Sequence, residues 1–118
     1  MISLKTRLLH VRANVSDLNK SIKWYEEILG FKVTGKWPPQ RPNYAHFGSE
    51  EGATFSIMES EKLPSNGRFN FTVEDIDGLW NKLKDKVDVV EELFDTPYGT
   101  RKFTIKDIDG NELGFVQE

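Results

Sequence analysis

Val15-Ser16-Asp17-Leu18 and Val73-Glu74-Asp75-Ile76 are two versions of one motif, placed 58 residues apart. In each copy the motif joins an alternating apolar stretch, typical of a strand, to residues with the spacing of an amphipathic helix. A repeat at a fixed offset indicates architecture more firmly than the propensities of single residues. Two copies of this length are too few for a solenoid, so they predict two similar halves related by a pseudo-two-fold.

The residues around the first copy predict a β-α-β-β-β order. Residues 9–15 alternate between apolar and polar side chains, and Asp17 or Ser16 is placed to cap a helix at 18–29. Further strands are expected at 31–33, 44–48 and 53–59. The stretch 35–42 contains three prolines and is expected to form a loop.

The residues around the second copy predict the same order. A strand at 69–73 precedes a helix that Asp75 caps and whose apolar stripe ends at Leu83. Three further strands are expected at 87–94, 100–106 and 112–116. We therefore predict an α+β fold of two tandem βαβββ modules, residues 1–60 and 67–118, with a linker at residues 61–66.

Composition excludes several classes of function. The chain has 118 residues and no cysteine, which excludes disulfides, zinc ribbons and thiol nucleophiles. Its net charge is −3 and its basic residues are scattered among acidic ones, which argues against nucleic acid as a partner. No segment has the length and apolarity of a signal peptide or a membrane span. We expect a cytoplasmic protein with no membrane partner.

Strand alternation predicts which side chains share a polar surface. If the apolar face of each sheet packs on its helix, the polar faces line a shared cup of mixed sheet with the helices outside. The residues predicted to face the cup are His10, Arg12, Asn14, Thr54, Ser56, Met58, Arg68, Asn70, Thr72, Glu112, Gly114 and Val116. A register error of one residue would invert this set.

Two segments of the chain resemble the vicinal oxygen chelate superfamily, which includes glyoxalase I, extradiol dioxygenases, fosfomycin-resistance enzymes and bleomycin-resistance proteins. The opening segment is Leu8-Leu9-His10-Val11 followed by Asp17-Leu18, Ser21-Ile22, Trp24-Tyr25 and Leu29-Gly30-Phe31. The closing segment is Asp107-Ile108-Asp109-Gly110-Asn111-Glu112-Leu113. The resemblance spans nearly the whole chain and implies the same fold. It says less about activity, because this fold hosts several chemistries.

The resemblance also implies four positions for a divalent metal, one on the first and one on the fourth strand of each module. They read His10, Ser56, Arg68 and Gly114 here. Only His10 is a good ligand, because a serine hydroxyl is poor, glycine offers none and arginine repels the ion. His46, Glu59 and Glu112 lie near enough to be considered for a rebuilt site, but one face would hold Glu59 and Glu112 together with Ser56 only if a bulge intervenes. We expect no metal and no other cofactor, with a divalent metal the less favoured alternative.

The two arginines of the predicted cup suggest an anionic ligand. If Arg12 and Arg68 are partly buried, each guanidinium requires an anionic or carbonyl partner. A small carboxylate, phosphonate or phenolate would provide one, and a salt bridge between Arg68 and Glu112 is an equal alternative. Trp37 and Tyr98 lie in loops that overhang ligand sites in the family, and their flat rings suit a planar ligand.

These residues predict two classes of function. The favoured one is a metal-free homodimer that binds a small planar or anionic molecule through Arg12, Trp37, Ser56, Arg68, Asn70, Tyr98, Glu112 and Gly114. The alternative is an enzyme: a dioxygenase-like or metal-dependent protein, or a lyase or isomerase of the glyoxalase type in which His10 is the catalytic base.

Overall fold

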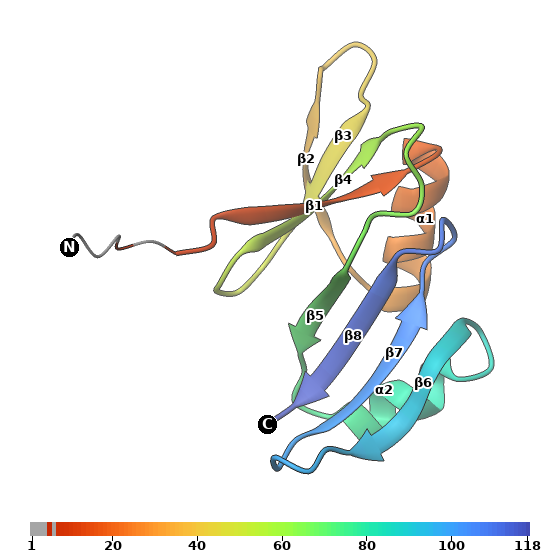
Figure 1. The fold of residues 1–118 in the computed structure, drawn as a ribbon. Helices are drawn as coiled ribbons and strands as arrows, with labels where there is room; N and C mark the ends of the chain where they lie inside the picture. The colour runs from red at the N-terminus through yellow and green to blue at the C-terminus, as the bar shows by residue number, and fades with distance from the viewer. Residues whose placement is uncertain (1–4, 6) are drawn as a thin grey trace. The chain divides into compact units, whose positions relative to one another are not determined.

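The computed structural model describes residue 5 and residues 7–118 (Figure 1). The chain divides into two compact units, and the boundary between Glu61 and Lys62 falls inside the segment 61–66 that was predicted to be a linker. No helix in the described part of the chain is long and apolar enough to cross a membrane.

Both units have the βαβββ order. The first unit contains β1 (His10–Val15), α1 (Leu18–Leu29), β2 (Val33–Trp37), β3 (Tyr44–Phe47) and β4 (Thr54–Glu59). The second contains β5 (Arg68–Thr72), α2 (Ile76–Leu83), β6 (Asp88–Asp95), β7 (Arg101–Lys106) and β8 (Glu112–Gln117). The predicted α+β fold of two tandem modules is therefore confirmed.

The two sheets have equivalent strand orders, β1-β4-β3-β2 and β5-β8-β7-β6. The first and fourth strands of each unit run parallel, and the other pairs are antiparallel. In each unit the helix packs on one face of its own sheet (Figure 1). The register pairs His10 with Thr54 and Arg68 with Glu112, which confirms the predicted strand faces.

Aromatic clusters between helix and sheet form the core of each unit. In the first unit the buried ring of Tyr25 lies 5.2 Å from Phe47 and 5.6 Å from Phe55, between ring centroids. In the second unit the central ring belongs to a strand residue, Phe103, which lies 5.1 Å from Trp80. These contacts bury the apolar faces and leave the polar faces of the sheets away from the helices.

The start of each helix is held by the fourth strand of the same unit. The backbone N–H of Leu18 donates to Oε2 of Glu59 over 2.8 Å, and the N–H of Ile76 donates to Oε1 of Gln117 over 2.9 Å. The two pairs are related by the 58-residue offset. Asp17 and Asp75 cap the same helices as predicted, by accepting from the N–H three residues later. Two otherwise unpaired N–H groups of each helix start are thus satisfied.

The prediction of a loop at 35–42 is wrong at its start. Strand β2 continues to Trp37, with Gly35 opposite His46 and Trp37 opposite Tyr44. An irregularity between Val33 and Gly35 shifts the register, which masks the strand pattern in the sequence. Proline lacks the N–H that strand pairing needs, so the strand stops before Pro38.

Replacing Glu59 by alanine should lower the free energy of unfolding by about 1 kcal/mol, because the N–H of Leu18 loses its acceptor. Chemical denaturation measures the change. The matched control is Glu61→Ala, two residues later and outside the strand, which should change stability by less than about 0.5 kcal/mol. Equal losses in the two variants would contradict the proposed role of Glu59.

Candidate functional site

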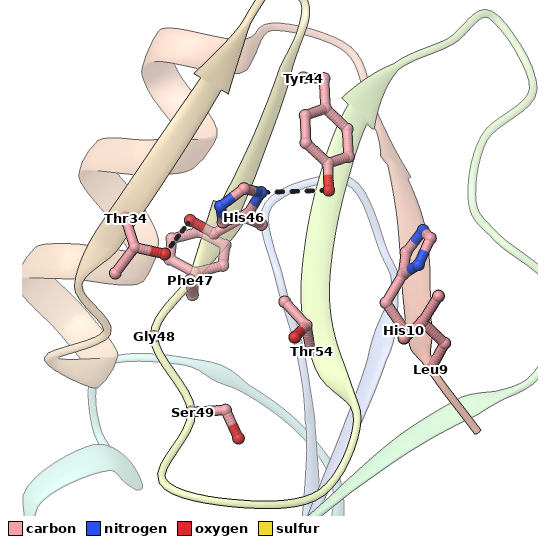
Figure 2. Close-up of a pocket in the computed structure, with 9 residues that line it drawn as sticks. All are labelled: Leu9, His10, Thr34, Tyr44, His46, Phe47, Gly48, Ser49 and Thr54. Atoms are coloured by element: carbon pink, nitrogen blue, oxygen red, sulfur yellow. Dashed lines mark hydrogen bonds between the residues drawn. The ribbon is translucent and has the colours of Figure 1, made fainter. Parts of the chain in front are cut away.

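A pocket of about 430 Å³ opens on the first unit (Figure 2). All four strands or their ends contribute polar side chains to its lining: His10, Thr34, Tyr44, His46 and Thr54. Figure 2 shows the imidazoles of His10 and His46 on either side of the strand that carries Thr54. The described residues that line the pocket include no aspartate and no glutamate.

The ring of His46 is positioned by two neighbours. A Cβ at position 35 would lie only 2.5 Å from Nε2 of His46, so the ring occupies the space that Gly35 leaves by having no side chain. On the other side, Nδ1 of His46 lies 3.3 Å from the hydroxyl of Tyr44 (Figure 2). If Tyr44 donates in this contact, Nε2 carries the proton and is a hydrogen-bond donor.

Three residues predicted from the sequence lie on the same sheet face but outside the pocket lining. Arg12 is paired with Ser56, and Ser56 with His46, so these residues form one row across the sheet. Trp37 is paired with Tyr44, and its side chain is 64% exposed. Within the described residues Arg12 forms no salt bridge, and it is exposed. The condition that Arg12 is partly buried is therefore not met, since β1 is an edge strand.

The four positions that the family uses for a metal do not provide a ligand set here. Ser56 is fully buried and its hydroxyl donates to the carbonyl of Val11 over 2.8 Å. Gly114 lies directly beneath the amide of Asn70, so a side chain at 114 would collide with it. Arg68 is a cation, which leaves His10. Among the described residues, no group of three His, Asp or Glu is placed to hold a metal ion.

The guanidinium of Arg68 is paired within the second unit. Its Nη2 lies 2.8 Å from Glu112 and its Nη1 lies 2.8 Å from Glu91. Of the two alternatives that the sequence left open, the structure contains the salt bridge with Glu112. The Arg68 side chain keeps 30% of its accessible surface, so it is partly buried among these partners although Arg68 is the first residue of the edge strand β5.

Glu91 is the centre of this charged cluster. One carboxylate oxygen accepts from Thr104 over 2.8 Å and from Arg68, and Lys102 approaches it to 3.9 Å. The hydrogen bond from Thr104 and the positive charge of Arg68 lower the pKa of Glu91 below its ordinary value of 4.5. The hydrogen bond with Glu112 and the charges of both glutamates raise the pKa of Arg68.

The other predicted site residues lie in the second unit. Asn70 is exposed above Gly114, and Tyr98, which is 74% exposed, lies in the turn between β6 and β7. Of the nine predicted site residues, only His10 lines the pocket of the first unit. Tyr44 and His46 were not among the predicted ligand-binding residues, and His46 was considered only for a rebuilt metal site, although the two alternate along β3 and so must share one face.

The family model described as Glyoxalase/Bleomycin resistance protein/Dioxygenase superfamily matches residues 7–115. The chain belongs to this superfamily. A member of the same fold group among solved structures is TnmS3, an antibiotic binding protein from Streptomyces sp. CB03234, with a TM-score of 0.80 at 21% identity over 98% of both chains. A superfamily protein from Sphaerobacter thermophilus DSM 20745 also has a TM-score of 0.80, at 22% identity over 97% of this chain and 98% of that one.

One curated relative in the superfamily has higher sequence identity. A probable trivalent organoarsenical cleaving enzyme from Bacillus subtilis (strain 168) is 33% identical over 119 residues, which cover 92% of this chain and 78% of the relative. The solved structures show the fold alone at their level of identity. Superfamily membership is thus consistent with small-molecule binding and with enzymatic activity.

Replacing Gly35 by alanine should turn the His46 ring away from its position, because the new methyl group needs the same space. We expect the ring signals of His46 to shift in nuclear magnetic resonance spectra and the hydrogen bond with Tyr44 to be lost. The free energy of unfolding should change by less than about 1 kcal/mol, since a flexible side chain moves rather than the backbone. In a His46→Ser background, Gly35→Ala should be neutral. A ring that stays in place would contradict this account.

The lowered pKa of Glu91 predicts how stability depends on pH. A carboxyl group with a lower pKa in the folded state contributes stability above its unfolded pKa and loses it as pH falls through the folded value. Glu91→Gln should therefore reduce the acid-induced loss of stability below about pH 4.5. Chemical denaturation at pH 7 and at pH 3.5 measures the loss of unfolding free energy between the two pH values, with Glu92→Gln as the neighbouring control. An unchanged pH dependence would refute it.

Proposed function

We propose that the protein binds a small planar anion on the polar sheet face of its first unit. The observation that carries the proposal is the pocket itself: His10 offers one hydrogen-bond donor, the hydrogen-bonded pair of Tyr44 and His46 offers one more, and no lining residue in the described part is acidic. An anion entering this pocket meets donors without a competing carboxylate.

Two residues beside the pocket support a planar and negatively charged ligand. Arg12 has no carboxylate partner among the described residues and lies two positions along β1 from His10. Trp37 presents an exposed ring next to Tyr44. A guanidinium attracts carboxylates and phosphonates, and a flat indole stacks on planar rings. The roles of Ser56, Arg68, Asn70, Tyr98, Glu112 and Gly114 in ligand binding stay predictions.

An enzymatic function is the second candidate, because a relative at 33% identity is named as a probable cleaving enzyme for trivalent organoarsenicals. Trivalent arsenic is a soft centre that prefers thiolate ligands. This chain has no cysteine, so it would have to hold such a substrate without a thiolate. A reaction without metal would use His10 or His46 as the base.

Two further properties remain proposals from the sequence. We propose a homodimer, for which the exposed Leu8 and Leu9 are candidate contact residues at 68% and 70% exposure. We also propose that the protein acts in the cytoplasm. Neither property is needed for the ligand proposal, which concerns side chains of the first unit.

The proposal is tested by titrating the protein with benzoate, a planar carboxylate, and with benzamide as its neutral counterpart. Benzoate should shift the backbone signals around His10, Tyr44 and His46, and Arg12→Gln should weaken its binding at least threefold through the lost charge. Arg7→Gln is the control for general charge. Equal binding of benzamide, or no shift in the first unit with benzoate, would refute the proposal.

Metal analysis of the same protein after incubation with Ni²⁺, Zn²⁺ or Mn²⁺ tests the metal-dependent form of the second candidate. Stoichiometric metal that is lost on His10→Ala would favour the metal-dependent enzyme over the metal-free binding protein. We expect only trace metal in both the wild type and the His10→Ala variant.

A further inference from the structure

Part of the pocket lining in the first unit has a counterpart in the second. Four polar residues of the pocket lie 58 positions before four residues of the charged cluster. His10, Tyr44, Thr54 and His46 correspond to Arg68, Lys102, Glu112 and Thr104. The strand registers agree, because His10 pairs with Thr54 as Arg68 pairs with Glu112.

In the second unit this set of residues surrounds a carboxylate. Oε1 of Glu91 lies 2.8 Å from Nη1 of Arg68, 2.8 Å from the hydroxyl of Thr104 and 3.9 Å from Nζ of Lys102. Glu112 belongs to the same set and binds Arg68 from the other side. The counterparts of three pocket residues thus all act as partners of one carboxylate oxygen.

By strand pairing, Glu91 takes the place that Gly35 has in the first unit, although the 58-residue offset would put Leu93 there, because β6 has register shifts on both sides of Glu91. Gly35 is paired with His46 across β2 and β3, and Glu91 is paired with Thr104 across β6 and β7. At these two paired positions, the large and the small side chain are on opposite strands in the two units. The first unit has no side chain on its edge strand and a large ring on the next one, and the second unit has a long carboxylate on its edge strand and a small hydroxyl on the next.

We propose that the carboxylate of Glu91 occupies in the second unit the position that the oxyanion of a ligand occupies in the first. The inference rests on the proposed function and deepens it, because it identifies the ligand group as a carboxylate or a similar oxyanion. The second unit then contains a carboxylate site that is closed by its own side chain, and the first contains the open copy.

The charges of the corresponding residues in the two units fit this assignment. In the second unit Arg68 and Lys102 neutralise two internal carboxylates, those of Glu91 and Glu112. In the first unit the counterpart of Glu112 is the uncharged Thr54, so no internal acid competes for the donors of the pocket. His10 and the hydrogen-bonded pair of Tyr44 and His46 each offer an N–H or O–H donor, and such donors suit an anion that arrives from solvent and leaves again.

Removing the Glu91 side chain should open the second site. We expect wild-type protein to bind one benzoate per chain, with signal shifts confined to the first unit. Glu91→Gly should bind two, with new shifts at Arg68, Lys102 and Thr104. Glu92→Gly, the same substitution one residue along β6, should still bind one. Titration with benzoate at constant ionic strength, followed by nuclear magnetic resonance, counts the binding sites. If the glycine variant unfolds β6, Glu91→Ala provides the same test.

The converse change should close the first site. Gly35→Glu combined with His46→Thr copies the second unit into the first, and it should reduce benzoate binding there at least tenfold. His46→Thr alone removes one donor but adds no carboxylate, so it should weaken benzoate binding less than the double variant does.

The outcomes separate this inference from the proposed function. If the wild type binds benzoate and neither Glu91 variant gains a site, the inference is overturned and the proposed function stands. If only the Glu91 variants bind benzoate, the closed site of the second unit is supported and the planar-anion function of the first unit fails. Second-site shifts in Glu92→Gly would also overturn the inference, because the effect would not be specific to Glu91.

Discussion

The parallel pairing of the first and fourth strands in each unit is the constraint on which the rest of the structure depends. It aligns His10 with Thr54 and Arg68 with Glu112, and side chains that are paired directly share one face of a sheet. The opposite face is apolar and packs on the helix. A shift of one residue would move the polar residues into the core, so the burial of the apolar face also determines which side chains are available to a ligand.

The fold was predictable because its signals are local and repeated. Alternation, the caps at Asp17 and Asp75 and the 58-residue offset all point to the same βαβββ units. The site was only partly predictable. The sequence identified His10 and the sheet face, but the space beside His46 depends on Gly35, which sits behind an irregularity in β2 where alternation fails. The partners of Arg68 come from strands distant in the sequence, so Glu91 carried no local signal.

The two units show how one backbone serves two purposes. The same four sheet positions hold an internal ion cluster in the second unit and line an open pocket in the first. Two of the positions that the resemblance implies for a metal contribute to packing within their own sheets, because the buried hydroxyl of Ser56 joins β4 to β1 and Gly114 makes room for Asn70.

The contact between Gly35 and His46 has a consequence for how such a pocket can change over evolutionary time. Because the imidazole fills the volume above the glycine, a side chain at 35 is accommodated only after the ring is displaced or shortened. The two positions are therefore epistatic: the effect of a substitution at one depends on the residue at the other. The second unit, with Glu91 beside Thr104, represents the opposite solution to the same packing problem. A change from one arrangement to the other by single substitutions passes through an intermediate. In that intermediate the two side chains either collide or leave an unfilled space.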